Sequence, residues 1–174
     1  MLQAKDYQQR WNEVGAAHFE RAYRAGVATD LEVFLDEMFS LVELSPFAVG
    51  PALGLGLEGL LIPREAPPFL CLESETRLLK AQPELGGRLS LYLDGRGNPL
   101  CVEVSSAGGA VVWLDHDQAF RGRIFVNSSV AAFAEALLLS ASMQLGKRNR
   151  LEAMEELDPA AMAPGTFWAT HLDR

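Results

Sequence analysis

Residues 89–117 read LSLYLDGRGNPLCVEVSSAGGAVVWLDHD, a stretch with three runs in which apolar side chains recur at every second position. A period of two places such side chains on one face of a β-strand. The linkers DGRGN and SSAGG have the length and composition of hairpin turns, and the glycines and Asn98 are expected to supply the positive φ angles of the first turn. The stretch therefore predicts three antiparallel strands joined by two turns.

The same period continues on both sides of this stretch. LGLGL and FLCLE precede the three runs and RIFV follows them, each bounded by Gly, Pro, Ser or Asp. Because the runs are separated by short turns rather than by helices, we expect an antiparallel meander of about six strands over residues 52–126, not a series of βαβ units.

In the N-terminal part, apolar residues recur at helical spacing instead of at every second position. After a first run with aromatic residues at helical spacing, residues 29–44 (TDLEVFLDEMFSLVEL) carry one apolar stripe. Thr29 and Glu32 form a capping-box pattern at its start, and Pro46 stops it. This segment predicts a single amphipathic helix.

A second helical region follows the meander and begins with the sequence FVNSSVAAFAEALLLSA. Asn127 or Ser128 is placed to cap this apolar helix, and capping explains Ser128 and Ser129 better than a nucleophile does, because neither lies in a G-x-S-x-G turn. Further on, Asp158 and Pro159 form a cap followed by a first helical residue.

Together these patterns predict a single α+β domain over residues 1–174, with a mostly antiparallel, twisted sheet in residues 52–126. Helices in residues 1–50 and 127–174 are expected to pack against the sheet. The predicted core residues are Leu91, Leu93, Val102, Val104, Val111 or Val112, Trp113, Phe133 and Leu137.

The bulk composition is that of an acidic globular protein, with 23 acidic against 15 basic side chains and a formal charge of −8 over 174 residues. Binding to phosphates requires Lys and Arg, so this balance argues against direct nucleic-acid binding and fits a basic protein partner. No apolar signal segment opens the chain, and no apolar run approaches the roughly 18 residues of a membrane helix. We expect a cytoplasmic protein without a membrane partner, in which Cys71 and Cys101 are buried, reduced thiols.

A nucleotide-binding pattern occurs at residues 54–59, GLGLEG, and Glu73 follows it where a ribose-binding carboxylate would stand. Such a site needs a helix directly after the glycines, because the pyrophosphate sits on that helix's N-terminus. Pro63, Pro67 and Pro68 prevent a helix of useful length. We therefore expect no nucleotide cofactor.

The segment Asp115-His116-Asp117 is the one concentration of potential metal ligands in the sequence. A metal site needs further ligands from other elements, and His18 and His171 are the remaining histidines. Acidic residues after a strand usually form turns. We expect a turn here, with no metal and no catalytic residue.

Three segments of the sequence, in the order in which they occur, resemble one family. They are the stretch 89–117 quoted above, FVNSSVAAFAEALL at 125–138, and DPAAMAPGTFWATHL at 158–172. Together they resemble the SUKH superfamily and are most similar to its fourth group. The resemblance implies an immunity protein of bacterial polymorphic toxin systems, which binds and blocks a cognate toxin, often a nuclease or a nucleic-acid deaminase. It also implies a protein that is not an enzyme, and it carries over no catalytic or contact residue.

The expected function is thus stoichiometric neutralisation of a cognate protein toxin. Two alternatives remain: a secretion or effector chaperone, which self-association would distinguish, and a small enzyme with a site near Asp115-His116-Asp117. Loops on a rigid sheet tend to carry binding residues. The predicted partner-binding carboxylates are Asp94, Asp115 and Asp117 in turns, with Glu73 and Glu75 after the second strand-like run.

Overall fold

The computed structural model describes residues 4–38, 41–43, 61–63, 65–66, 70–73, 82–106, 108–142 and 147–171. Its centre is a six-stranded antiparallel sheet in the order β3-β4-β5-β6-β7-β8. The strands are β3 (Glu65–Ala66), β4 (Leu70–Leu72), β5 (Leu89–Leu93), β6 (Pro99–Glu103), β7 (Ala110–Asp115) and β8 (Gly122–Asn127). Strands that follow one another in sequence are neighbours in space. The predicted meander and the α+β class are confirmed.

The first predicted strand does not correspond to the edge of this sheet. The edge strand is β3, whereas the LGLGL and GLGLEG segments, residues 53–59, lie outside the described residues. After them the chain is extended: β2 (Leu61–Pro63) pairs antiparallel with β1 (Leu41–Glu43) in a separate two-stranded sheet.

The long helix predicted over residues 29–44 is wrong in its second half. Helix α2 (Leu31–Met38) ends early, and β1 follows it. The apolar residues of β1 fit either period, and pairing with β2 satisfies its backbone groups. The predicted cap is also wrong, because Val33 N donates to Asp30 Oδ1 (3.1 Å), so Asp30 rather than Thr29 caps the helix.

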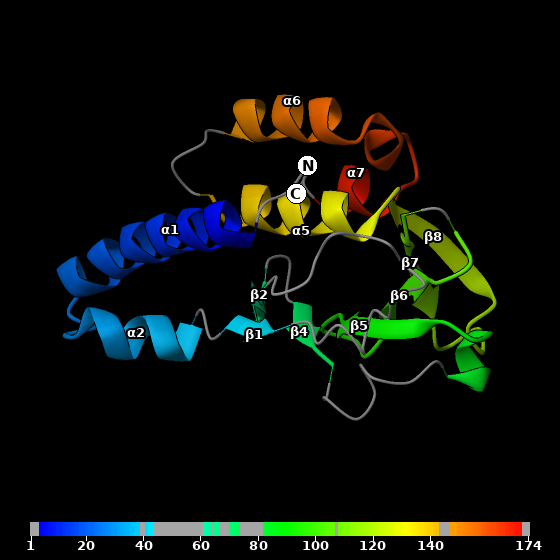
Figure 1. Ribbon diagram of the computed structural model, residues 1–174, viewed down its shortest axis with the longest axis horizontal. Helices are drawn as coiled ribbons and strands as arrows, with labels where there is room; N and C mark the ends of the chain where they lie inside the picture. Colours follow the sequence, from blue (N-terminus) through cyan, green and yellow to red (C-terminus); the bar gives the residue numbers. More distant parts are fainter. Residues whose placement is uncertain are drawn as a thin grey trace.

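The helices lie mainly on one side of the sheet (Figure 1). They are α1 (Ala4–Arg24), α2, α5 (Val130–Ala141), α6 (Lys147–Leu157) and α7 (Phe167–His171), with 3-10 turns η2 (Pro83–Leu85) and η3 (Pro159–Met162). Helix α5 lies between the sheet and α6, while α1 and α2 extend away from the sheet at one end of the longest axis. Helix α5 is therefore covered on several sides, which explains why it is apolar almost all round.

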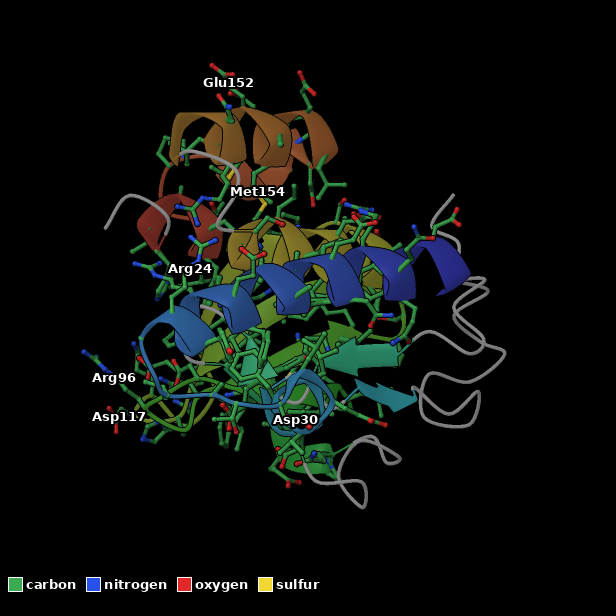
Figure 2. All side chains as sticks on the ribbon, turned by 90° about the vertical axis from the view of Figure 1, so that its left-hand side faces the viewer. Arg24, Asp30, Arg96, Asp117, Glu152 and Met154 are labelled. Carbon is green, nitrogen blue, oxygen red and sulfur yellow. The ribbon has the colours of Figure 1, made fainter. Side chains whose placement is uncertain are left out.

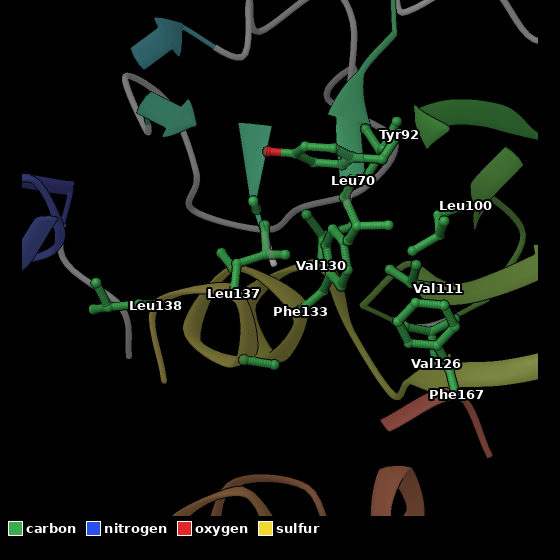
Figure 3. Packing of buried hydrophobic residues seen from close by; sticks show 14 of the residues in the cluster. Leu70, Tyr92, Leu100, Val111, Val126, Val130, Phe133, Leu137, Leu138 and Phe167 are labelled. Carbon is green, nitrogen blue, oxygen red and sulfur yellow. The ribbon is translucent and has the colours of Figure 1, made fainter. Parts of the chain in front are cut away.

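The main core fills the space between the sheet and α5 (Figure 3). Phe133 of α5 packs edge-on against Tyr92 of β5, with ring centroids 5.7 Å apart, and also contacts Trp168 of α7 at 6.5 Å. The predicted core residues that are buried in this cluster are Leu91, Val102, Val111, Phe133 and Leu137. Val104 and Trp113 are half-buried and pack against this cluster, whereas Leu93 is half-buried and is not part of it.

A second, smaller cluster covers the opposite face of the sheet. It consists of Leu85 from η2 with Cys101, Val112 and Leu114, and the half-buried Phe120 packs against it. Both Val111 and Val112 are thus buried, one on each face, because adjacent strand residues point to opposite sides.

The two cysteines differ in exposure. Cys101 is buried as predicted, whereas the prediction for Cys71 is wrong, because this residue is exposed. Cys71 lies in β4, next to the two-residue edge strand β3, where few neighbouring side chains can cover the sheet.

Candidate functional site

The turns after β5 and after β7 meet at one end of the sheet. Both follow strands that run in the same direction, since β6 between them is antiparallel to each. Asn98 of the first turn joins them: its Oδ1 accepts a hydrogen bond from His116 N (3.0 Å) and lies 2.6 Å from His116 Nδ1. We call residues 94–98 and 115–121 the turn platform. It brings together the predicted carboxylates Asp94, Asp115 and Asp117.

Asp94 organises the first turn through both of its carboxylate oxygens. Oδ1 accepts hydrogen bonds from the backbone N–H groups of Arg96 and Asn98, each at 2.8 Å. Oδ2 accepts from Trp113 Nε1 at 2.8 Å and from Asn98 Nδ2 at 3.0 Å. The carboxylate thus ties its own turn to strand β7.

These contacts also set the acidity of Asp94. Partial burial opposes ionisation and raises the pKa, but the hydrogen bonds from Trp113, Asn98 and Arg96 outweigh it, so the pKa of the carboxyl lies below its ordinary value. The platform therefore keeps a negative charge at this position across the neutral range.

Asn98 has a different role from the predicted one. In this turn Gly97 has a positive φ, 83°, while Asn98 is not among the residues with positive φ. The Asn98 side chain is 4% exposed and bridges Asp94 to His116. Its amide offers donors and an acceptor in one rigid group, which suits a link between two turns.

The second turn is held from within and carries backbone strain. Asp115 Oδ1 accepts from Asp117 N (2.9 Å) and its Oδ2 accepts from Gln118 Nε2 (2.7 Å). Ala119 and Phe120 have φ angles of 50° and 61°, which cost energy for residues other than glycine. Packing of Phe120 against the smaller core cluster compensates for this conformation.

The charges of the platform are mixed rather than purely acidic. The exposed Arg96 and Arg121 stand beside Asp94, Asp115 and Asp117, which leaves one net negative charge when His116 is neutral. Figure 2 shows Arg96 and Asp117 on the same side of the molecule, both pointing outward. The platform therefore carries only a small excess of negative charge.

The remaining two predicted carboxylates do not join the platform. Glu73 N donates to Leu91 O, which places Glu73 beside the middle of β5, away from the turn. Its side chain is 7% exposed and accepts a hydrogen bond from Ser90 Oγ (3.1 Å). Glu75 lies outside the described residues.

The histidines are used separately. His18 Nε2 lies 3.0 Å from Ala141 O, and His171 Nδ1 lies 2.8 Å from Phe167 O, so neither approaches His116 as a further ligand. Within the described ranges, no three His, Cys, Asp or Glu side chains form a group that could hold a metal ion. None of the helices formed by these residues is both long and apolar enough to cross a membrane.

A second polar network fastens the C-terminal segment to β8. Asp158 Oδ2 accepts from Asn127 Nδ2 (3.1 Å), Ser128 N (2.7 Å) and Ser128 Oγ (3.1 Å). Trp168 Nε1 donates to Asn127 Oδ1 at 2.8 Å. Asn127 and Ser128 are therefore not the caps predicted for α5.

The cap of α5 is Ser129. Its side chain accepts from Ala132 N, because Ser129 is the residue that directly precedes the first helical turn. Asp158 does stand at the start of η3 with Pro159 at its first position, but the Asp158 side chain makes no capping hydrogen bond there.

Trp113, which supports the turn platform from β7, and Asn98 within the platform have roles that the sequence did not predict. Trp113 was expected in the core; it is half-buried and packs against the main cluster, and its indole N–H also donates to Asp94. The available signal was chemical: a tryptophan that is partly buried needs an acceptor for its N–H, and the turn between the two preceding strands contains Asp94.

Comparisons with protein-family models, with curated proteins and with solved structures found no match for this chain. The resemblance to the SUKH superfamily rests on the sequence patterns and stays a prediction.

Proposed function

We propose that this protein is an immunity protein that binds and neutralises a cognate toxin of a bacterial polymorphic toxin system, in the cytoplasm, through the turn platform. The observation that carries this proposal is a set of hydrogen bonds: Trp113 and Asn98 donate to Asp94, and Asn98 accepts from His116. These hydrogen bonds hold the two turns in one arrangement before any partner binds. Binding then loses little conformational freedom, which favours tight association.

The side chains presented by the platform suit a protein partner. His116, Asp117 and Gln118 are exposed at the tip of the second turn, and Arg96 is exposed on the first. Charged and amide groups on a rigid frame give specificity through matched pairs across an interface. The overall charge of −8 favours a basic partner such as a nuclease or a deaminase, whose substrate-binding surface must attract phosphates.

A secretion or effector chaperone is the second candidate. The observation that favours it is the exposure of Val27 (81%) and Tyr23 (60%) around the end of α1, since apolar surface can hold an unfolded segment. An immunity protein binds its folded target and abolishes the target's activity at one-to-one stoichiometry. A chaperone binds an unfolded segment and releases an active protein.

The test is copurification of the protein from its native cell, followed by association kinetics with the captured partner. Asp117→Lys is the sharpest variant, because this side chain is 85% exposed and contacts His116, with Oδ1 3.2 Å from His116 Nε2. We expect slower association for Asp117→Lys and a weaker dependence of its rate on ionic strength.

The matched control is Glu155→Lys on α6, an exposed charge change on the far side of α5 from the sheet. It should change the association rate much less than Asp117→Lys. Equal rates for the two variants at low and at high salt would exclude the turn platform as the contact surface. A captured partner that keeps full activity in the complex would exclude the immunity function.

A further inference from the structure

The tip of the second turn places two acceptor atoms side by side. His116 Nε2 lies 3.2 Å from Asp117 Oδ1, and both side chains are open to solvent, being 40% and 85% exposed. Whether a hydrogen atom lies between these two atoms depends on which ring nitrogen of His116 carries the proton. The hydrogen bonds on the other side of the ring decide this.

Asn98 determines which nitrogen of His116 is protonated. Asn98 Oδ1 accepts from the backbone N–H of His116 (3.0 Å), and Asn98 Nδ2 donates to Asp94 Oδ2 (3.0 Å). Because a backbone N–H can only donate and an ionised carboxylate can only accept, the amide of Asn98 cannot be reversed. His116 Nδ1 lies 2.6 Å from the same Oδ1, so Nδ1 carries a proton and donates it.

Neutral His116 therefore has a bare Nε2. An uncharged imidazole holds one proton on its two nitrogens, and in this ring that proton is on Nδ1. Nε2 then lies 3.2 Å from the carboxylate oxygen of Asp117 with no hydrogen between them, and two acceptors at this distance repel each other. A donor that reaches both atoms, or a second proton on the ring, removes the repulsion.

The acceptor pair is held in place by its own turn and is not neutralised by a basic side chain. Asp117 N donates to Asp115 Oδ1 at 2.9 Å, and Ala119 N donates to His116 O at 3.0 Å. Among the described residues, no arginine or lysine forms an ion pair with Asp117, the two arginines of the turn platform included. The turn thus presents a fixed, negatively charged pair of acceptors.

We propose that neutral His116 and Asp117 together bind one arginine side chain of the protein partner. This inference rests on the proposed function, because it names the group that the turn platform takes from its partner. Two N–H groups of a planar guanidinium point in nearly the same direction, so they can donate to two acceptors 3.2 Å apart. The N–H bonds of a lysine ammonium diverge from one nitrogen, and two of them cannot point at atoms so close together.

A metal ion suits the pair less well than a guanidinium. A structural or catalytic zinc site takes at least three protein ligands, and the described residues contain no group of three His, Cys, Asp or Glu side chains that could hold a metal. The formal charge of −8 also favours a basic partner, and such a partner offers arginine side chains on its surface.

The first test measures the tautomer of His116 by ¹⁵N nuclear magnetic resonance of the full chain at pH 8, where an ordinary imidazole is neutral. We expect a proton on Nδ1 and a bare Nε2. His18 is the internal control, because its Nε2 lies 3.0 Å from the carbonyl oxygen of Ala141 and should carry the proton instead. A His116 ring with its proton on Nε2, or with both nitrogens protonated, would overturn the proposal.

The second test adds model compounds of single side chains at constant ionic strength: N-acetylarginine amide, N-acetyllysine amide and the uncharged N-acetylcitrulline amide. The arginine compound should shift the Nε2 resonance of His116 several times more than the other two do. Asp117→Asn should abolish this shift, whereas the matched change Glu155→Gln on α6 should leave it as in the parent. Equal shifts for the three compounds, or a shift that survives Asp117→Asn, would contradict arginine binding.

The third test separates this proposal from the proposed function, using the partner captured by copurification. In His116→Asn, the side-chain amide can still donate to Asn98 Oδ1, but no acceptor remains at the position of Nε2. We expect an unchanged melting temperature and a dissociation constant for the partner raised about tenfold, through faster dissociation.

Two outcomes of this third test distinguish the proposals. If Asp117→Lys slows association while His116→Asn binds like the parent, the turn platform is the contact surface and only the arginine proposal is wrong. If both variants bind the captured partner like the parent, the platform is excluded as the contact surface and the arginine proposal fails with it.

Discussion

Two hydrogen-bond networks in this molecule are each built from a tryptophan, an asparagine and an aspartate, but they differ in their exposure to solvent. At the turn platform, Trp113 and Asn98 both donate to Asp94, and the carboxylate stays half-exposed. At the C-terminal end of β8, Trp168 donates to Asn127 and Asn127 donates to Asp158, and all three are buried.

The difference is one of solvent access. A surface network can exchange a lost hydrogen bond for one to water, whereas a buried network that loses a member leaves polar groups without partners. The surface network therefore arranges side chains for recognition at modest cost to stability. The buried network fastens the C-terminal segment to the sheet, and the fold depends on it.

The largest expected effect is from removing the ring that supports the buried network. Phe133 lies between Tyr92 and Trp168, with ring centroids at 5.7 and 6.5 Å. Phe133→Ala should lower the free energy of unfolding by about 3–5 kcal/mol, through lost burial and the cavity left behind. Urea denaturation measures this, and an unchanged midpoint would contradict the assigned helix face.

The contrast between the two networks can be tested by removing the two aspartates one at a time. Asp158→Ala deprives Asn127 and both donors of Ser128 of their acceptor and should cost about 3 kcal/mol. Asp94→Ala should cost less, about 1–2 kcal/mol, because the half-exposed position of the carboxylate lets water reach the Arg96 backbone donor, although Asn98 is 4% exposed. Equal losses in urea denaturation would show that burial does not separate the two networks.

Replacing each tryptophan by phenylalanine removes one indole N–H and keeps most of the ring. Trp168→Phe should cost about 2 kcal/mol, since Asn127 Oδ1 loses its donor in the core. Trp113→Phe should cost about 0.5–1 kcal/mol and should also loosen the platform. Thermal denaturation gives the stability difference. Amide hydrogen exchange at residues 94–98 reports the loosening, and protection there equal to that of the parent would contradict the role of Trp113.

The smallest expected effect is the pH dependence that Asp94 contributes. Its pKa is lowered in the folded state, so the unfolded chain binds more protons and stability rises with pH through this window. The contribution is complete above the unfolded-state pKa of about 3.9 and is lost as the pH falls through the lower folded-state pKa.

Asp94→Asn should therefore flatten the acid side of a stability–pH curve measured by urea denaturation. Glu155→Gln, a change to an exposed carboxylate on α6, serves as the control. If the stability of the parent and of Asp94→Asn depends on pH in the same way at acid pH, the hydrogen bonds of Asp94 do not stabilise its charge.

The sheet was predictable because its signals are local. Strands β5 to β8 alternate with short turns in which Gly97, Gly108 and Gly109 adopt positive φ. Side-chain period and turn length then determine which strand is next to which, and the confirmed meander follows from them. The turns with Asp94 and with Asp115-His116-Asp117 were predictable for the same reason.

The wrong predictions concern residues that could pair with more than one segment of the chain. Val42 fits a helical stripe and a strand equally well, and pairing with Ile62, twenty residues away, places it in β1. Asn127 and Ser128 have good capping side chains, but Asp158 and Trp168 engage them from the C-terminal segment.

The sequence by itself thus determined the order of strands β4 to β8, the turns between β5 and β8 and the apolar faces, since each depends on residues close together in the chain. Only the tertiary structure decided that Asn98 links two turns, that Glu73 is buried and Cys71 exposed, and that Trp113 supports a surface carboxylate. The physical reason is that a polar side chain has several possible partners of similar strength. Which one it takes depends on the geometry and solvent access that arise when distant segments meet.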